Sequence, residues 1–208
     1  MMKKYIKCVL LVCATLSGFS LVGGAWAIDV GKLTMICANC HGKGGASTEP
    51  DIPIIGGYSA ESIIGDLMSY KNDERDCTET KYRTTSKQGT KIYMCQLIKD
   101  LNDNDIKQLA RYFAKQKFVR AKQKFDPELA KKGKDIHDVS CEKCHSESGA
   151  VAGDDAGILA GQWMPYLKQA FKDYASGKRP VAKKMKMKMD ELSKADIDAL
   201  INYYGSFQ

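Results

Sequence analysis

The sequence has little proline, little histidine and no long apolar run in its main body. Five of the 208 residues are proline, three are histidine, and nothing after Ile28 is long and apolar enough to cross a bilayer. The hydrophobic content of 44% and the low proline content both argue against a disordered chain. A spanning helix needs ~20 mainly apolar residues, so we expect no transmembrane segment in the mature chain. The length allows one domain or two small ones.

Residues 1–27 have the features of a secretory signal peptide. Three lysines open it, residues 8–22 are largely apolar, and Ala25-Trp26-Ala27 fits the small-x-small cleavage pattern. An uncleaved membrane anchor is the alternative, for which the apolar stretch is short. We predict cleavage after Ala27 and a periplasmic mature protein, in a compartment where disulfides persist. Cleavage removes three lysines and no acid, so the net charge falls from +7 to +4.

One segment of the sequence occurs twice. Cys37-Ala38-Asn39-Cys40-His41 returns 104 residues later as Cys141-Glu142-Lys143-Cys144-His145. Residues further on match at the same offset, as Tyr70 and Tyr174 do. Similarity at a constant offset indicates a tandem duplication of one small domain.

The two copies differ by an insertion. From Met94 onward, which matches Met185, the offset is 91 instead of 104, so the first half carries a net insertion of 13 residues. We therefore predict a signal peptide over 1–27, a first domain over 28–118 and a second over 119–208.

Each half is predicted to be helical. Apolar residues recur at helical spacing over 60–70, 103–116, 165–174 and a segment opened by Ser193. Asp126 before Pro127 indicates a further helix start. No segment shows convincing strand alternation, so the expected class is all-α. A helical domain of ~90 residues has a thin core, and we expect something else to fill it.

The repeated Cys-x-x-Cys-His motif is the attachment signature of c-type haem. Its two thiols add to the porphyrin vinyl groups, and its histidine is placed to ligate iron. A zinc site or a thioredoxin-like redox pair also uses Cys-x-x-Cys, but zinc needs further ligands and the redox pair needs no histidine. We predict two covalently bound haem c groups. The residues are Cys37, Cys40 and His41 in the first half and Cys141, Cys144 and His145 in the second.

Histidine cannot be the second axial ligand at both haems. Only His137 lies outside the motifs, four residues before Cys141, a spacing of about one helical turn. We interpret His137 as a partly exposed helix residue on the proximal side of the second haem.

Met94 and Met185 are the predicted second ligands. They match each other in the duplication, and each lies seven residues before the leucine that leads into the last helix of its half. A thioether ligand raises the reduction potential. The alternative for a methionine is core filling, which suits Met68 because its counterpart is Lys172. Cys95 is a minor alternative ligand.

Cys77 and Cys95 remain after the haem cysteines are assigned, and both lie in or beside the insertion. In an oxidising compartment we expect them to form a disulfide. A reactive thiol pair near the first haem is the alternative.

The mature chain resembles the dihaem cytochrome c4 family over nearly its whole length. Its second half is especially similar to the dihaem subunit of flavocytochrome c, a sulfide dehydrogenase. The segments that carry this similarity are 121–126, 141–145, 158–163, 165–167, 179–180 and 183–185. The insertion that contains Cys77 is not part of that pattern.

The resemblance implies two tandem class I cytochrome c domains whose haems approach across the interface, each with His–Met ligation. It also implies that the Pro53 carbonyl holds the ring of His41, whereas the second half has Gly157 there. The implied function is electron transfer without catalysis by the chain itself. As the haem subunit of flavocytochrome c, the chain would have a flavoprotein sulfide dehydrogenase subunit or another redox protein as its partner. The alternative function is that of a free cytochrome c4 shuttle that delivers electrons to a terminal oxidase.

Two other classes of function have less support from the sequence. A dihaem peroxidase needs a labile axial position, and two available methionines argue against one. Six basic residues between 178 and 188 could suggest binding to nucleic acid or a membrane surface. We interpret them instead as a solvated rim that steers an acidic electron partner, and we expect no nucleic-acid ligand.

Overall fold

The computed structural model describes residues 29–154 and 156–208. The predicted signal peptide lies outside this part of the chain. The helices are α1 (Val30–His41), η1 (Lys43–Gly45), α2 (Ala60–Lys71), α3 (Met94–Lys99), α4 (Asp103–Ala114), α5 (Pro127–Ser140), α6 (Ser146–Gly149), η2 (Ala152–Asp154), α7 (Met164–Ala175), α8 (Lys183–Asp190) and α9 (Lys194–Gly205). The strands are β1 (Glu79–Lys81) and β2 (Lys91–Tyr93).

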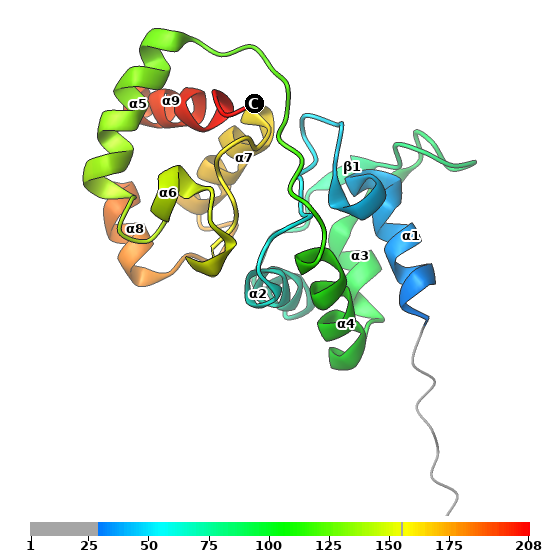
Figure 1. The fold of residues 1–208 in the computed structure, drawn as a ribbon. Coiled ribbons are helices and arrows are strands. Elements are labelled where there is room, and N and C mark those ends of the chain that lie inside the picture. Colours follow the sequence, from blue (N-terminus) through cyan, green and yellow to red (C-terminus); the bar gives the residue numbers. More distant parts are fainter. Residues whose placement is uncertain (1–28, 155) are drawn as a thin grey trace, which may run out of the picture.

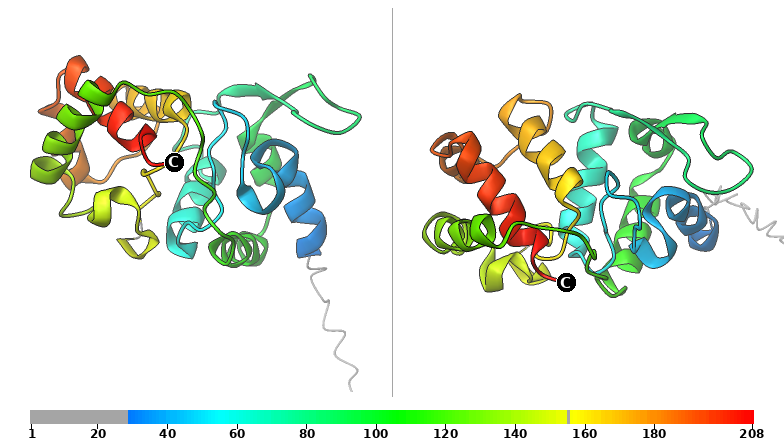
Figure 2. Two further views of the ribbon diagram at one scale, coloured as in Figure 1. Left: turned by 45° about the horizontal axis from the view of Figure 1, so that its top comes forward. Right: turned by 90° about the horizontal axis from the view of Figure 1, so that it is seen from above.

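Two helical bodies lie side by side (Figure 1). One contains α1 to α4 and the other α5 to α9, and the segment over 115–126 runs between them (Figure 2). Apart from two short strands, the regular structure of the described residues is helical, as expected for the all-α class.

Helices α5 and α9 begin at the capping residues that the sequence predicts. Asp126 accepts hydrogen bonds from the amides of Glu128 and Leu129, with Pro127 in the first turn of α5. Because the caps satisfy backbone N–H groups that have no partner within the helix, they define where each helix begins. The Ser193 cap is part of a capping box at the start of α9, and α4 opens with the same device at the matching position.

The duplication is also visible in the loops that close each half. The Gly57 amide donates to the Phe113 carbonyl at 2.9 Å, and the Gly161 amide donates to the Tyr204 carbonyl at 2.8 Å. Both glycines have φ near 84°, at 83° and 85°. A Cβ at Gly161 would lie 2.5 Å from Cγ of Arg120, so glycine is required for this close approach.

Each half has its own apolar core. Ile106, Leu109 and Phe113 of α4 pack in the first, and Leu200 and Tyr204 of α9 pack in the second. Met68 packs against the first core, as predicted for a core-filling methionine.

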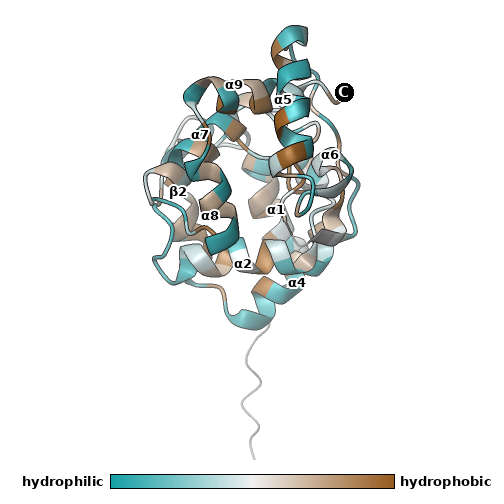
Figure 3. Cartoon of the chain, turned by 90° about the vertical axis from the view of Figure 1, so that its left-hand side faces the viewer, coloured by the Kyte–Doolittle hydropathy of each residue, from teal (hydrophilic) through white to brown (hydrophobic). Residues whose placement is uncertain are grey.

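Both halves leave apolar side chains exposed beside their motifs, such as Met35 at 64% in the first. The view that shows α5 and α8 has hydrophobic positions along α5 among hydrophilic ones (Figure 3). Val139 is 85% exposed and Met187 58%, and α8 has no buried residue. Such sparse packing agrees with a domain whose core is completed by a bound group.

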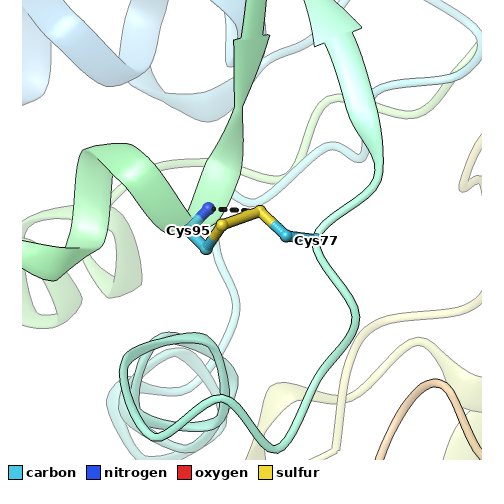
Figure 4. The surroundings of a disulfide bond; sticks show 2 residues. All are labelled: Cys77 and Cys95. Atoms are coloured by element: carbon cyan, nitrogen blue, oxygen red, sulfur yellow. Dashed lines mark hydrogen bonds between the residues drawn. A yellow bond between two sulfur atoms is a disulfide. The ribbon is translucent and has the colours of Figure 1, made fainter.

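The insertion folds as a small hairpin. β1 and β2 pair antiparallel, with Glu79 opposite Tyr93, and the tip of the hairpin points away from the second half (Figures 1 and 2). Three-residue strands are too short to show alternation, which is why the sequence did not reveal them. Cys77 and Cys95 form a disulfide at its base (Figure 4), so the predicted pairing is confirmed.

A buried glutamine joins the two halves. Gln162 is fully buried, and its side chain accepts from the Ile54 amide at 3.0 Å and donates to the Ile54 carbonyl at 2.9 Å. It also donates to the Tyr58 hydroxyl at 2.8 Å. Trp163 donates to the Ser47 carbonyl at 2.9 Å. These bonds orient the halves because each satisfies a polar group that water cannot reach.

No helix among the described residues is long and apolar enough to cross a membrane.

Candidate haem-binding sites

The first motif lies on the last turns of α1. Cys37 and Cys40 are half-buried and unpaired, and His41 is buried. The Nδ1 of His41 lies 2.9 Å from the Pro53 carbonyl oxygen. Since a carbonyl only accepts, Nδ1 carries the proton and Nε2 keeps its lone pair for a metal. The expectation that Pro53 holds this ring is confirmed.

Burial also sets the protonation of the motif side chains. It lowers the pKa of His41, against the raising effect of the Pro53 hydrogen bond, and so favours the neutral imidazole that can ligate. It raises the pKa of Cys37 to about 11 and that of Cys40 and Cys141 above the usual value. A thioredoxin-like pair needs a thiol of lowered pKa, so the redox-pair alternative is disfavoured.

Met94 begins α3, directly after β2. It is half-buried and packs against the same apolar core as Cys37. The disulfide of the neighbouring Cys95 ties this point to the base of the hairpin. With its sulfur committed to that bond, Cys95 is not a free thiolate ligand.

The second motif follows the end of α5. Cys141 caps that helix, Cys144 is exposed, and His145 is half-buried. Met185 lies within α8 and is half-buried. The run of lysines around it propagates as a helix because lysine and methionine are both good helix formers.

The interpretation of His137 as partly exposed is also wrong. The residue lies in α5, and its side chain is completely buried between the Tyr204 hydroxyl and the Glu142 carboxylate. A helical pattern alone does not show this, because the burial comes from α9 packing across α5.

The donor set fits haem c. The free cysteines of the described chain are the four of the two motifs. Zinc would need a cluster of three or more histidine, cysteine or acidic side chains, and the described residues contain none.

The interface also carries a surplus of positive charge. Arg75 and Arg179 occupy matching positions in the duplication, and each contacts Asp66, at 3.1 and 2.8 Å. Both arginine side chains are only 10% exposed. Besides Asp66, Arg75 lies over the ring of Tyr70 at 4.4 Å and Arg179 lies over the ring of Tyr174 at 4.7 Å. Sequence reasoning missed this cluster, although the 104-residue match of the two arginines was available.

Comparisons with known proteins agree with this arrangement. Residues 128–203 match the family described as cytochrome c oxidase, cbb3-type, subunit III. Cytochrome c4 of Pseudomonas aeruginosa is 27% identical over 206 residues, which cover 93% of this chain and 94% of that protein. The comparisons support the dihaem cytochrome c4 family.

Solved structures of cytochrome c4 are similar over both halves. The reduced recombinant protein from Pseudomonas stutzeri has a TM-score of 0.67 and 25% identity, covering 88% of this chain and 100% of that one. The Acidithiobacillus ferrooxidans protein has a TM-score of 0.65 and 26% identity, covering 82% and 98%. Like cytochrome c4, this chain is a dihaem c-type cytochrome with two covalently bound haem c groups, and its role is electron transfer.

Proposed function

We propose that this chain is a free dihaem electron carrier of the periplasm, which accepts electrons from one redox protein and delivers them to another, such as a terminal oxidase. The observation that carries the proposal is the pair of duplicated attachment motifs with free thiols in two joined helical halves. Similarity to cytochrome c4 over 93% of this chain and 94% of the relative supports a carrier built from these two halves.

The proposed axial ligands are His41 with Met94 and His145 with Met185. A haem held in this way has no open coordination position, so it exchanges electrons without binding a substrate. The polypeptide supplies the orientation of each ligand. Pro53 holds the His41 ring, and the disulfide keeps the start of α3 in place.

The halves must keep a defined separation for electrons to pass between them. Gln162, Trp163 and the Asp66 cluster supply that rigidity from residues about 100 positions apart in the chain. We infer that the interface serves to hold the two haem sites in one arrangement.

A basic rim beside Met185 is the proposed steering surface for an acidic partner. Lys183 and Lys184 are exposed on α8, whereas Lys186 and Lys188 each pair with an acid of the same chain. Exposed charges act through long-range attraction that salt screens. Charge reversal at Lys184 is therefore expected to weaken the salt dependence of electron exchange.

A second candidate function is the haem subunit of a flavocytochrome c sulfide dehydrogenase. It is supported by the combined similarity of the second-half segments 121–126, 141–145, 158–163, 165–167, 179–180 and 183–185, since residues 159–162 alone are shared with the wider cytochrome c4 group. The relatives matched along the whole chain favour the free carrier. Purification from the native host separates the two proposals: a larger flavin-containing protein that co-purifies, together with haem reduction by sulfide, would favour the second.

The ligand assignment is tested by single substitutions in the holoprotein. Met94→Ala and Met185→Ala should each remove about half of the red absorption band of ferric His–Met haem, since each removes one thioether ligand. Met187→Ala is the matched control, because this exposed methionine lies on the same helix as Met185. A full band in either of the first two variants would contradict the assignment, and absence of the band in the wild type would reopen the peroxidase alternative.

A further inference from the structure

The second half contains a buried hydrogen-bonded histidine that ligates nothing in the proposed function. His137 of α5 has no exposed surface. Its Nδ1 lies 2.9 Å from the hydroxyl of Tyr204, and its Nε2 lies 2.6 Å from a carboxylate oxygen of Glu142. A buried polar side chain with both nitrogens satisfied has one orientation, because any rotation would leave a nitrogen unpaired.

Glu142, which His137 contacts, also binds the turn that follows His145. Its carboxylate accepts from the amide of Glu147 at 2.9 Å and from the amide of Ser148 at 3.2 Å. The hydroxyl of Tyr203 reaches the same turn, where it donates to the Ser148 hydroxyl at 2.7 Å.

The turn needs such support because its backbone is unfavourable for these residues. Glu147 has φ of 50° and Ser148 has φ of 66°, in the left-handed region that side chains with a Cβ rarely adopt. A conformation of this kind persists only where the surroundings hold it. Here the surroundings are the carboxylate of Glu142 and the hydroxyl of Tyr203.

The first half builds the corresponding turn without this network. At the 104-residue offset, His137 becomes Leu33, Glu142 becomes Ala38 and Ser148 becomes Gly44. Gly44 has φ of 64°, nearly the angle of Ser148, but glycine adopts it readily. At this position the two halves thus reach nearly the same φ by different means, whereas at the preceding position Glu147 is left-handed and its counterpart Lys43 is not.

We propose that His137 and Glu142 are positioning residues for the second haem. Tyr204 orients His137, His137 aims the Glu142 carboxylate, and that carboxylate holds the turn after His145 in its left-handed conformation. The proposal rests on the proposed role of His145 as axial ligand. It predicts that the ligand geometry of the second haem alone depends on this network.

The test is a variant that gives the second half the residues of the first, His137→Leu with Glu142→Ala, in the full-length holoprotein. Amide hydrogen exchange at Glu147 and Ser148 should become at least about tenfold faster, because their acceptor is gone. In a redox titration, the reduction equilibrium of the second haem should move by at least about threefold relative to the first. The first haem serves as an internal control and should not move.

Two further variants separate positioning from general loss of stability. Ser148→Gly added to the double variant should restore the exchange rate and the redox equilibrium at least in part, since glycine removes the need for the network. Ile201→Val removes one methyl group from the packing of α9 and changes no residue of the network. It should alter neither the exchange rate nor the redox equilibrium. If the double variant does not fold, Glu142→Gln alone is measured, because it keeps the size of the side chain and weakens its acceptor.

Three results would overturn the proposal: unchanged exchange and redox behaviour in the double variant, no recovery with Ser148→Gly, or an equal effect of Ile201→Val. None of these depends on the second ligand being methionine. Failure of the proposed function would appear instead in the wild type, as an absent His–Met band.

Discussion

At the scale of single residues, the interface depends on a few buried polar groups. Gln162 satisfies both backbone groups of Ile54 and also reaches Tyr58. The hydrophobic pattern of the sequence does not reveal such a role, because a glutamine beside Trp163 is equally consistent with an exposed loop. Its importance follows from partners that lie more than 100 residues earlier.

We therefore predict that Gln162→Leu lowers the free energy of unfolding by about 1–3 kcal/mol, because it leaves the Ile54 amide and carbonyl buried without partners. Urea unfolding of the holoprotein measures this. Gln169→Leu is the control, because that side chain is exposed and bonds only Asp173. It should change stability by less than about 0.5 kcal/mol, and an equal loss in both variants would contradict the role of Gln162.

At the scale of elements, the helix caps and the disulfide were both predictable from the chain. Ser193 and Asp126 were recognised as caps because capping is a local interaction within one turn. The hairpin was not predicted, because its strands are three residues long and depend on the Cys77–Cys95 bond and on pairing across the insertion.

The α9 cap should respond to acid. The hydroxyl of Ser193, and secondarily Lys132, lowers the pKa of Asp196 to about 2. A carboxylate whose pKa is lowered by folding contributes stability above its ordinary pKa, near 3.8, and loses that contribution as the pH falls toward 2. Asp196→Asn should therefore be less stable than wild type at pH 6, and the difference should shrink between about pH 4 and pH 2.

Ser193→Ala supplies the comparison for this acid response. It removes the main cause of the lowered pKa and should cost about 1 kcal/mol as a lost cap. Thermal unfolding across the pH series measures both variants. A difference between Asp196→Asn and wild type that stays constant down to pH 2 would contradict the assignment.

The disulfide should stabilise the first half selectively. Replacing Cys77 and Cys95 by serine opens a loop of 18 residues and should lower stability by about 3 kcal/mol. Since Cys95 adjoins Met94, the His–Met absorption of the first haem should weaken while that of the second stays. Spectra of variants that keep only one haem, recorded at the same temperature, would show whether the first haem alone is affected. An equal loss of His–Met absorption at both haems would contradict the prediction.

At the scale of the whole molecule, Asp66 links the two halves through charge. It contacts Arg75 of its own half and Arg179 of the other. We predict that Asp66→Asn lowers stability by about 2–3 kcal/mol, because a charge-assisted bond to each buried arginine is weakened. Trp163 fluorescence during urea unfolding reports the separation of the two halves, since the indole of Trp163 donates to the Ser47 carbonyl across the interface.

The control for Asp66 is an exposed ion pair within one half. Asp103 contacts Lys71 at 3.1 Å and is 72% exposed. Asp103→Asn should cost less than about 0.5 kcal/mol, because exposed pairs contribute little. An equally small effect at Asp66 would mean that the interface does not depend on this cluster.

The sequence by itself determined the haem attachment motifs, the duplication, the starts of five helices and the disulfide pairing. These depend on residues close together in the chain or on one segment repeating another, so spacing is enough to find them. The tertiary structure alone decided the burial of His137, the pairing of Gln162 with Ile54 and the sharing of Asp66 by two arginines. Those contacts join segments far apart in the chain, two of them across the two halves at separations of about 100 residues, and local patterns carry no information about such contacts. The outcome for His137 shows the physical reason most clearly: a neighbouring helix, not its own helical spacing, removes it from water.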